Sequence, residues 1–419
     1  MQPSLQTILA GLQDCPCGRR HEMPPMAVEI GPGLLARAAG ILAANGFPRN
    51  VLAVADENTL RASEGILEIL AAGGFRCELR LYGDMRTADM RDVNALEELC
   101  ARADGVLSVG SGSLNDICRL ASFRAGKAFA IFATAPSMDG FASDSAPITE
   151  HNFKKSIPCR APSVIIGDTE ILARAPAVLK SAGFGDMLAK YVALVDWHVA
   201  RLTVGEHFCP NVAAITENAL QRVVRMAGRV TQNDTETAGA IMEALVMTGL
   251  AMTLANSTRP ASGCEHIISH FWEIKKLERG EPSDFHGRKV AVATLMAAGM
   301  YHELVSREHI GFHADATDWG AVYAAYGPNF AQDLLECNHP SVTDETSPEI
   351  LRERWPEIRR IVREILPSAE ELRALLMVAG APTEPGEIGV SPELAAAGLA
   401  FHPYMRHRMT LSRLRGMIT

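Results

Sequence analysis

The pattern of hydrophobic and polar positions changes about 175 residues into the chain. Before that point, short β-rich runs alternate with segments of helical periodicity, which is the pattern of βαβ units. One such segment, ENTLRASEGILEILAAGGF, ends at a Gly-Gly pair that predicts a helix stop. The β-rich runs are MAVEIG, VLAVAD, CELRLYG, GVLSVG, AFAIFAT and SVIIGD. We therefore expect a parallel sheet covered by helices.

From about residue 175 onward, long Ala-, Leu-, Met- and Glu-rich segments such as TAGAIMEALVMTGLAMTLANS replace the strand-like runs. This half is predicted to be all-helical, with Gly-, Pro- and Ser-rich loops at 257–265 and 278–287. The tail after residue 343 is charged and helical with proline breaks. The change of pattern predicts one domain over 1–174 and a second over 175–419, and no fixed-period repeat indicates a solenoid.

Composition adds limits to this picture. Hydrophobic residues make up 47% of the 419 residues and charged residues 21%, which is typical of a globular chain long enough for two domains. A net charge of -9 argues against a nucleic-acid binder, because such binding requires clustered cations. Any bound phosphate must therefore be held by local positive charge.

The first twenty residues lack the basic start and long apolar centre of a secretory signal. Apolar stretches such as 291–301 are shorter than a bilayer span, so no membrane span is expected. Nine scattered cysteines are unlike the dense, even pattern of a small secreted domain. We expect reduced thiols and a cytoplasmic protein.

Three potential metal ligands lie close together near the start of the chain. Cys15, Cys17 and His21 fall within seven residues and could form part of a zinc site. However, a fourth ligand is missing and the spacing matches no standard finger. The alternative is a packed N-terminal hook.

A glycine turn follows the predicted strand GVLSV and enters a helix. Gly110 and Gly112 would let the backbone approach a pyrophosphate, which the free N–H groups at the helix start attract. Asn115 stands where the usual dinucleotide fingerprint has its third glycine, so this signal is weak alone. Asp56 ends an earlier strand, where it could bind a ribose or cap the next helix. A second strand exit at 133–143 presents small residues on which a flat cofactor could lie.

Three histidines and one aspartate predict a metal site in the helical half. His266 and His270 are four residues apart and so face the same side of a helix, and His286 follows. A hydrogen-bonded core role is the alternative for each histidine. Gly183 and Gly185 are predicted to lie just before a helix that carries Asp186, whose alternative role is a helix N-cap. Together, Asp186, His266 and His286 would leave open positions on a divalent ion, as a catalytic metal requires, and His270 would be free for substrate or proton transfer.

Four segments in order resemble the sn-glycerol-1-phosphate dehydrogenases, a family within the iron-containing alcohol dehydrogenase and dehydroquinate synthase superfamily. The segments are GSGSLNDICRLAS, TAPSMDGFASDSAPIT, LKSAGFGDMLAKYVALVDW, and RPASGCEHIISHFWE followed by FHGRKVAV. They lie between about residues 25 and 330. The resemblance implies an α/β fold with an N-terminal Rossmann-like NAD(P)-binding domain and an all-helical C-terminal domain. The active site would lie in the cleft between the two domains.

The same resemblance implies roles for individual residues. Asp186, His266 and His286 match the metal ligands, whereas His270 and Asp139 match substrate contacts. The metal would be zinc or nickel, with iron frequent in the wider superfamily. Asn115 is in keeping with this group. The NAD(H) or NADP(H) contacts fall on Gly112, Ser113, Leu114, Asn115, Asp116, Thr134, Ala135, Pro136, Ser137 and Ser143.

The implied reaction is the reversible reduction of dihydroxyacetone phosphate to sn-glycerol 1-phosphate. Lys154, Lys155 and Arg259 are candidates for holding the phosphate of this triose, and an exposed basic surface is their alternative. Rival functions are another polyol dehydrogenase, such as a glycerol dehydrogenase, and a sugar-phosphate cyclase of the dehydroquinate synthase type. A non-enzymatic role comes third. The sequence leaves open the metal, the preference between NAD and NADP, a role in phospholipid metabolism and assembly into a homo-oligomer.

Overall fold

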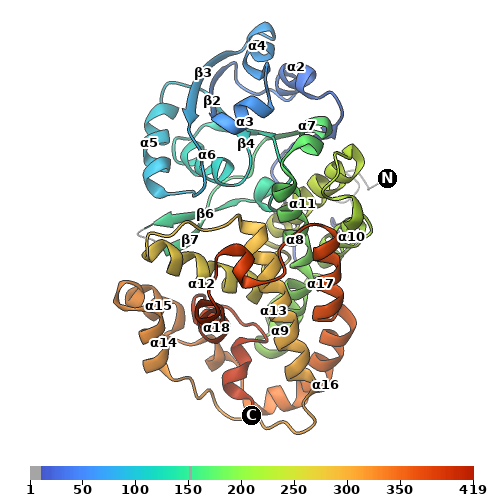
Figure 1. Ribbon diagram of the computed structural model, residues 1–419, viewed down its shortest axis with the longest axis vertical. Coiled ribbons are helices and arrows are strands. Elements are labelled where there is room, and N and C mark those ends of the chain that lie inside the picture. The colour runs from blue at the N-terminus through green and yellow to red at the C-terminus, as the bar shows by residue number, and fades with distance from the viewer. Residues whose placement is uncertain (1–10, 151–152) are drawn as a thin grey trace.

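The computed structural model describes residues 11–150 and 153–419, so part of the N-terminal segment considered for a secretory signal lies outside it. In this part of the chain, six strands form one parallel sheet in the order β1-β8-β5-β4-β2-β3 (Figure 1). The strands are Ala27–Gly31 (β1), Asn50–Asp56 (β2), Arg76–Tyr82 (β3), Gly105–Gly110 (β4), Ala128–Ala133 (β5) and Val164–Asp168 (β8). They coincide with the six predicted runs, and the predicted parallel sheet is confirmed.

Both faces of the sheet are apolar because helices cover both. Along β5, Phe129 and Ile131 join one hydrophobic core, whereas Ala130 and Phe132 join the other, as strand alternation requires. One face is covered by α2 (Ala38–Ala44) and α4 (Ile66–Ala72), and the other by α5 (Met90–Cys100) and α6 (Ser113–Arg124). The predicted stop at Gly73 is confirmed. The helix before it is broken, because Gly65 has a φ of +88° between α3 (Glu57–Ala62) and α4.

The strand order reverses direction between β2 and β4. From β2 the chain runs outward to β3 and then returns past β2 to β4, from which β5 and β8 follow on the opposite side. In open parallel sheets, the crevice at the carboxyl ends of two such strands is the usual ligand position. Asp56 ends β2 and Gly110 ends β4, so both predicted nucleotide-binding strand ends flank this crevice.

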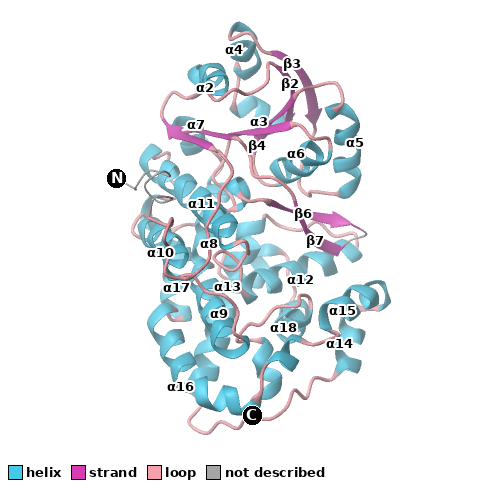
Figure 2. Ribbon diagram, turned by 180° about the vertical axis from the view of Figure 1, so that it is seen from behind, coloured by secondary structure: helices cyan, strands magenta, loops and turns pink. Residues whose placement is uncertain are grey.

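After β8, the chain forms helices only, which confirms the predicted all-helical second half (Figure 2). Figure 2 shows the sheet at one end of the molecule and the helices filling the other. The boundary at residue 174 stays a prediction. The helices are Thr169–Arg174 (α7), Ala177–Leu188 (α8), Lys190–Val204 (α9), Pro210–Val224 (α10), Thr235–Ala255 (α11), Cys264–Glu278 (α12), His286–Ser306 (α13), Trp319–Tyr326 (α14), Ala331–Asn338 (α15), Pro348–Ile365 (α16), Ala369–Val378 (α17) and Pro392–Phe401 (α18).

A small antiparallel hairpin, β6 (Ser145–Glu150) and β7 (Phe153–Pro158), was missed by the sequence analysis. Its strands are short, and Pro147 weakens the strand signal, although Ala146 and Ile148 alternate with less buried neighbours. In Figure 1 the hairpin lies between the sheet and the helical half, where β6 contacts α6 and β7 contacts α12. It therefore connects the two halves beside the predicted cleft.

Helix α11 is long and apolar enough to cross a membrane by length and composition, which the sequence analysis overlooked. In the structure, 89% of its most apolar window is buried inside the protein, against α7, α8 and α10 among others. A helix that is apolar on all sides is typical of the interior of a large domain. Its composition is explained by this central position.

Glycines in α8 and α13 allow unusually close packing. Gly183 and Gly185 lie inside α8, so the prediction that they precede a helix is wrong. A Cβ on Gly183 would lie 1.9 Å from the carbonyl oxygen of Pro136, and one on Gly287 would lie 2.0 Å from that of Ala182. These glycines hold α8 directly against the loop after β5 and against the start of α13.

We predict that Gly183→Ala lowers the free energy of unfolding by about 1–3 kcal/mol, because the added methyl group overpacks a backbone contact. Urea unfolding of the full chain measures this change. The control is Gly299→Ala in α13, where a Cβ would meet nothing within 4 Å, and which should raise stability by up to about 1 kcal/mol. Equal effects of the two substitutions would contradict the close-packing role of Gly183.

Candidate active site between the sheet and the helices

Three helix segments bring one carboxylate and two imidazoles together. Asp186 lies in the last turn of α8, His266 lies in the first turn of α12 and His286 is the first residue of α13. One ligand atom from each lies within 4.8 Å of the other two, and Asp186 Oδ1 is 3.5 Å from His266 Nε2. Asp186 is inside its helix, so the N-cap alternative is wrong. The three predicted ligands therefore form one compact group.

His270 lies one helical turn beyond His266 and outside this group. Its ring centroid is 6.2 Å from that of His266 and 5.7 Å from that of His286. Burial, reinforced by the positive charges of Lys154 and Arg406, holds the pKa of His270 well below its usual value. His270 is therefore neutral at pH 7 and faces the metal-binding group without belonging to it.

Glu265, which the sequence analysis did not select, orients His266. His266 Nδ1 is 2.6 Å from Glu265 Oε1, which also accepts a hydrogen bond from the backbone N–H of Gly263. A carboxylate on the second ring nitrogen fixes the tautomer of a metal-binding histidine and increases its basicity. The sequence signal was present, because Glu265 directly precedes His266.

Lys190 is the second residue that the sequence analysis missed. Its fully buried ammonium group pairs with Asp139 and lies 2.9 Å from Asp186 Oδ1. The backbone N–H of Asp139 also donates to Asp186 Oδ2, at 3.0 Å. Lys190 follows Asp186 by four residues, so this pair was visible as an i,i+4 spacing. The substrate-contact candidate Asp139 and the ligand Asp186 are thus joined by one cation.

The charges of this cluster suit a divalent cation. Three buried acidic side chains, of Asp139, Asp186 and Glu265, are accompanied by one ammonium group, that of Lys190, so acidic groups outnumber lysines in the cluster. Burial opposes ionisation of Asp186, but Lys190 and the hydrogen bond with His266 outweigh it and hold its pKa far below the usual range. Oxygen and imidazole nitrogen are also donors that zinc, nickel and iron(II) accept. The residues present therefore fit the expected metal.

The pKa values of His266 and His286 are consistent with cation binding by this group. Burial lowers the pKa of His266, but hydrogen bonds with Asp186 and Glu265 outweigh it and raise that pKa to about 9. Burial lowers the pKa of His286 to about 3, against the influence of Asp186. The side chains of Asp186 and Glu265 thus stabilise positive charge at His266, whereas His286 presents a neutral imidazole.

The crevice at the switch point has the features of a nucleotide site. Gly112 has a φ of +47° and open space where a Cβ would project, and the twelve-residue α6 begins immediately after it. Gly110 has a different role, because a Cβ there would lie 2.6 Å from Leu114 Cδ1. Asn115 is buried and accepts a hydrogen bond from Ser108, 2.7 Å away, so its side chain supports the loop from beneath.

The two predicted strand-end segments contact each other. Ser111 Oγ is 2.5 Å from Ser137 Oγ, and the fully buried guanidinium of Arg119 pairs with Asp116 and donates to the carbonyl oxygens of Gly140, Phe141 and Ser145. The candidate cofactor contacts thus form one surface. Those that follow β5 are Thr134, Ala135, Pro136, Ser137 and Ser143, all buried, and those around the start of α6 are Gly112, Ser113, Leu114, Asn115 and Asp116.

Asp56 caps α3, which was one of its two predicted roles. Its Oδ1 accepts hydrogen bonds from the backbone N–H groups of Asn58 and Thr59, at 2.9 and 2.8 Å. Contact between Asp56 and a ribose stays a prediction. The cap places the carboxylate at the rim of the switch-point crevice.

Of the three phosphate candidates, Lys154 alone lies beside the histidines. Its ammonium group is 2.9 Å from Glu273 Oε1, and Glu273 Oε2 is 2.8 Å from the ammonium group of Lys289. Lys155, the next residue of β7, points to the opposite side and pairs with the partly exposed Asp333 at 3.4 Å. The guanidinium of Arg259 is held by Glu206 and the carbonyl oxygen of Met409. Lys155 and Arg259 therefore have their partners away from the histidines, and only Lys154 stays a phosphate candidate.

Arg406 is a cation that the sequence analysis did not select. It lies after α18, and its guanidinium donates one long hydrogen bond, 3.5 Å, to the carbonyl oxygen of Lys154. No carboxylate of the described residues forms an ion pair with it. Lys154 and Lys289 thus share the single carboxylate of Glu273, and Arg406 lies beside Lys154 as a third cation. This leaves net positive charge beside His270.

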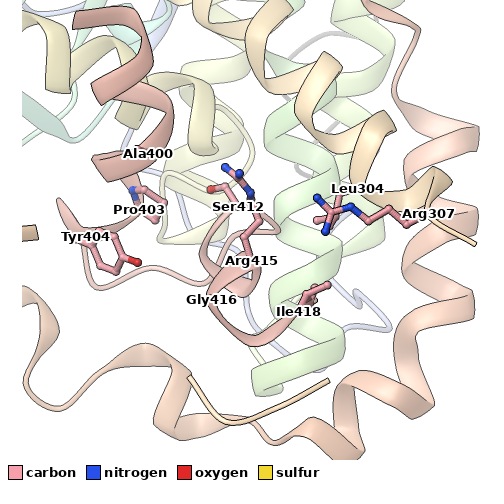
Figure 3. Close-up of a pocket in the computed structure, with 9 residues that line it drawn as sticks. All are labelled: Leu304, Arg307, Ala400, Pro403, Tyr404, Ser412, Arg415, Gly416 and Ile418. Atoms are coloured by element: carbon pink, nitrogen blue, oxygen red, sulfur yellow. The ribbon is translucent and has the colours of Figure 1, made fainter. Parts of the chain in front are cut away.

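A separate hollow in the surface lies at the other end of α13 (Figure 3). Leu304, Arg307, Tyr404 and Arg415 are among the residues that line it. Because α13 rises about 1.5 Å per residue, Arg307 lies about 30 Å from His286. This hollow contains none of the candidate site residues and is distinct from the predicted active site.

The sheet order and the helical second half are those of the iron-containing alcohol dehydrogenase fold. The sequence profile of the iron-containing alcohol dehydrogenases matches residues 29–176. The crystal structure of a probable glycerol dehydrogenase from Sinorhizobium meliloti 1021 has the same fold, with a TM-score of 0.63 at 17% identity, over 94% of this chain and 95% of that chain.

Curated relatives narrow the assignment to one family. Glycerol-1-phosphate dehydrogenase (NAD(P)+) of Geobacillus stearothermophilus is 31% identical over 420 residues, which covers 99% of this chain and 96% of the relative. The enzyme of the same name from Bacillus subtilis (strain 168) is 36% identical over 309 residues, which covers 71% of this chain and 78% of the relative. The chain belongs to the glycerol-1-phosphate dehydrogenase family, as the four sequence motifs predicted.

We predict that Glu265→Gln weakens divalent metal binding by about 10- to 100-fold, because His266 loses the carboxylate that orients it and increases its basicity. Metal titration of the full chain by calorimetry measures this change. Glu78→Gln, on the exposed strand β3, is the control and should leave the affinity unchanged. An unchanged affinity in Glu265→Gln would show that Glu265 does not support the metal ligand.

Proposed function

We propose that this chain is an NAD(P)H-dependent, metal-dependent oxidoreductase that reduces dihydroxyacetone phosphate to sn-glycerol 1-phosphate reversibly. The observation that carries the proposal is the position of the net positive cluster of Lys154, Lys289 and Arg406 directly beside the metal-binding group. Membership of the glycerol-1-phosphate dehydrogenase family supports the same substrate. The nine free thiols are in keeping with the cytoplasm, where we place the enzyme.

The metal, when bound, polarises the ketone and stabilises the negative charge that develops on its oxygen. Asp186, His266 and His286 would hold it, with Asp186 oriented by Lys190 and His266 by Glu265. Hydride comes from the nicotinamide, which the crevice between β2 and β4 would position. His270, held neutral by its surroundings, donates or accepts a hydrogen bond at the substrate oxygen or at a water beside it.

The phosphate end of the substrate is assigned to the cationic cluster. Glu273 is shared by two ammonium groups, and Arg406 has no carboxylate partner in the described part of the chain, so three cations face one carboxylate. A phosphate monoester carries a charge of about -1.5 to -2 at pH 7 and accepts several hydrogen bonds. It therefore balances this cluster, whereas an unphosphorylated polyol such as glycerol would leave the cations buried without a counter-charge.

We predict that Asp186→Ala loses metal and lowers kcat by about a thousandfold or more, because metal polarisation contributes several kcal/mol of transition-state stabilisation. The measurement is NADH and NADPH oxidation with dihydroxyacetone phosphate, before and after chelation, with the stereochemistry of the product determined. The fold should persist, since Lys190 keeps Asp139 as a partner. Normal turnover by metal-free Asp186→Ala would refute the site, and an absence of net NAD(P)H consumption by the wild type would favour a cyclase.

We also predict that Lys154→Met and Arg406→Met each lower kcat/KM for dihydroxyacetone phosphate by about 10- to 100-fold, because a hydrogen bond to a charged group contributes about 1.5–3 kcal/mol. Activity on unphosphorylated dihydroxyacetone should not fall in parallel. Lys155→Met, which alters the adjacent outward-facing cation, is the matched control. Equal losses on both substrates would show that these cations do not recognise the phosphate.

A further inference from the structure

A second group of metal-ligand side chains lies outside the active site. Cys15, Cys17 and His21 come from the segment before β1, and Cys209 comes from the loop before α10. One ligand atom of each lies within 4.8 Å of the other three. The sequence offered only the first three, and folding adds the fourth ligand from almost two hundred residues away.

The distances in this group match those of a tetrahedral zinc site. Zn–S bonds of about 2.3 Å and Zn–N bonds of about 2.0 Å set tetrahedral edges of about 3.8 Å between sulfurs and about 3.5 Å between sulfur and nitrogen. Cys15 Sγ is 3.5 Å from Cys209 Sγ, and His21 Nε2 is 3.2 Å from Cys17 Sγ and 3.4 Å from Cys209 Sγ. These three distances therefore differ from the tetrahedral edges by only a few tenths of an ångström.

His21 is oriented as a metal ligand. Its Nδ1 lies 2.8 Å from the carbonyl oxygen of Leu254, which can only accept a hydrogen bond, so Nδ1 carries the proton. Nε2 is then unprotonated and directs its lone pair at the thiols. A backbone carbonyl that fixes the tautomer in this way is a common partner of a metal-binding histidine.

N–H groups lie beside two of the sulfurs. Burial raises the pKa of the Cys209 thiol to about 12, and a backbone N–H group offsets part of this effect. Cys209 is fully buried at the N-cap of α10, and its sulfur accepts a hydrogen bond from the backbone N–H of Val212 at 3.4 Å. A helix N-terminus favours the thiolate, which is the form that binds metal. The side-chain amide of Asn211 is 3.4 Å from Cys15 Sγ. These N–H groups support the sulfurs without occupying the side of each that faces the other ligands.

We propose that Cys15, Cys17, His21 and Cys209 form a structural zinc site. Four protein ligands would close the coordination sphere, unlike the open active site, so its role is to stabilise the fold. It joins the segment before β1 to the helical half, where Leu12 and Cys15 already pack against Trp197 and Leu254. Because His21 holds the end of α11, the site also restrains the chain just before the loop that leads to α12 and His266.

A Cys15–Cys209 disulfide is the rival interpretation. The two sulfurs are 3.5 Å apart, whereas a disulfide bond is about 2.05 Å long, and the rest of the group is arranged around the space between them. A disulfide would also leave unexplained why Cys17 and the Nε2 of His21 converge on the same point.

The test measures bound zinc in proteins that carry Asp186→Ala, a substitution that removes the active-site metal. Zinc per chain is measured by mass spectrometry in Asp186→Ala, in Asp186→Ala with Cys209→Ala, and in Asp186→Ala with Cys77→Ala as the matched control. Cys77 is a free thiol of β3 that belongs to neither metal group. We expect one zinc per chain in the first and third proteins and none in the second.

Cobalt substitution identifies the ligands. The cobalt form of Asp186→Ala should show thiolate-to-metal charge-transfer absorption, which the sulfur-free active site cannot produce. Cys17→Ala in the same background should weaken this absorption, because one of the three thiolates is lost, and because Cys17 is only half-buried, its loss disturbs the core little. A folded Asp186→Ala chain without zinc and without this absorption would overturn the proposal. So would a mass lower by two hydrogens that reductant restores, since this would show the disulfide.

Discussion

The buried ammonium group of Lys190 is the interaction on which the active site depends. It neutralises part of the charge on Asp139 and Asp186, which come from the two halves of the chain, one from the loop after β5 and one from α8. Isolated buried carboxylates would be very costly, and each is stable only with a partner. By pairing with both, Lys190 fixes the distance between the sheet-side loop and the helical half. Because acidic groups outnumber lysines in this cluster, the site is suited to a divalent cation.

This electrostatic link requires the backbones to approach closely, and small residues make that approach feasible. Gly183 allows α8 to contact the loop at Pro136, and Gly249 of α11 lies where a Cβ would be 3.0 Å from the carbonyl oxygen of Asp139. Larger side chains at either position would displace the loop that carries Asp139 and the candidate cofactor contacts. These glycines support the candidate metal group although they do not contact its ligands. They set the position of the loop and therefore of the Asp139 carboxylate.

The parts of the fold and site that depend on local pattern could be predicted from the sequence. The six sheet strands and the all-helical second half follow from hydrophobic periodicity, and the His266–His270 spacing indicated a shared helical face. Residues whose role arises from contacts across the fold were missed, as with Arg406, whose importance depends on lying beside Lys154. Glu265 and Lys190 are intermediate cases. Their short spacings from His266 and Asp186 were visible in the sequence, but such spacings indicate a shared role only once the cluster is known to be buried. The interior position of Asp186 was mistaken for a helix start because glycine is more often a helix terminator than a packing residue.

Two clusters of opposite charge lie on either side of His270, and their separation explains how one cleft can accept both ends of a small phosphorylated ketone. The Asp186 side is negative before a cation binds, and the Lys154 side is positive before an anion binds. Burial and the positive side lower the pKa of His270, so its neutral imidazole adds no charge to either cluster. A substrate whose reactive oxygen is drawn to the metal and whose other end is an anion satisfies both clusters at once, whereas a neutral polyol satisfies one. In the proposed site, the substrate class is therefore set less by the three candidate metal ligands than by the cations beside His270.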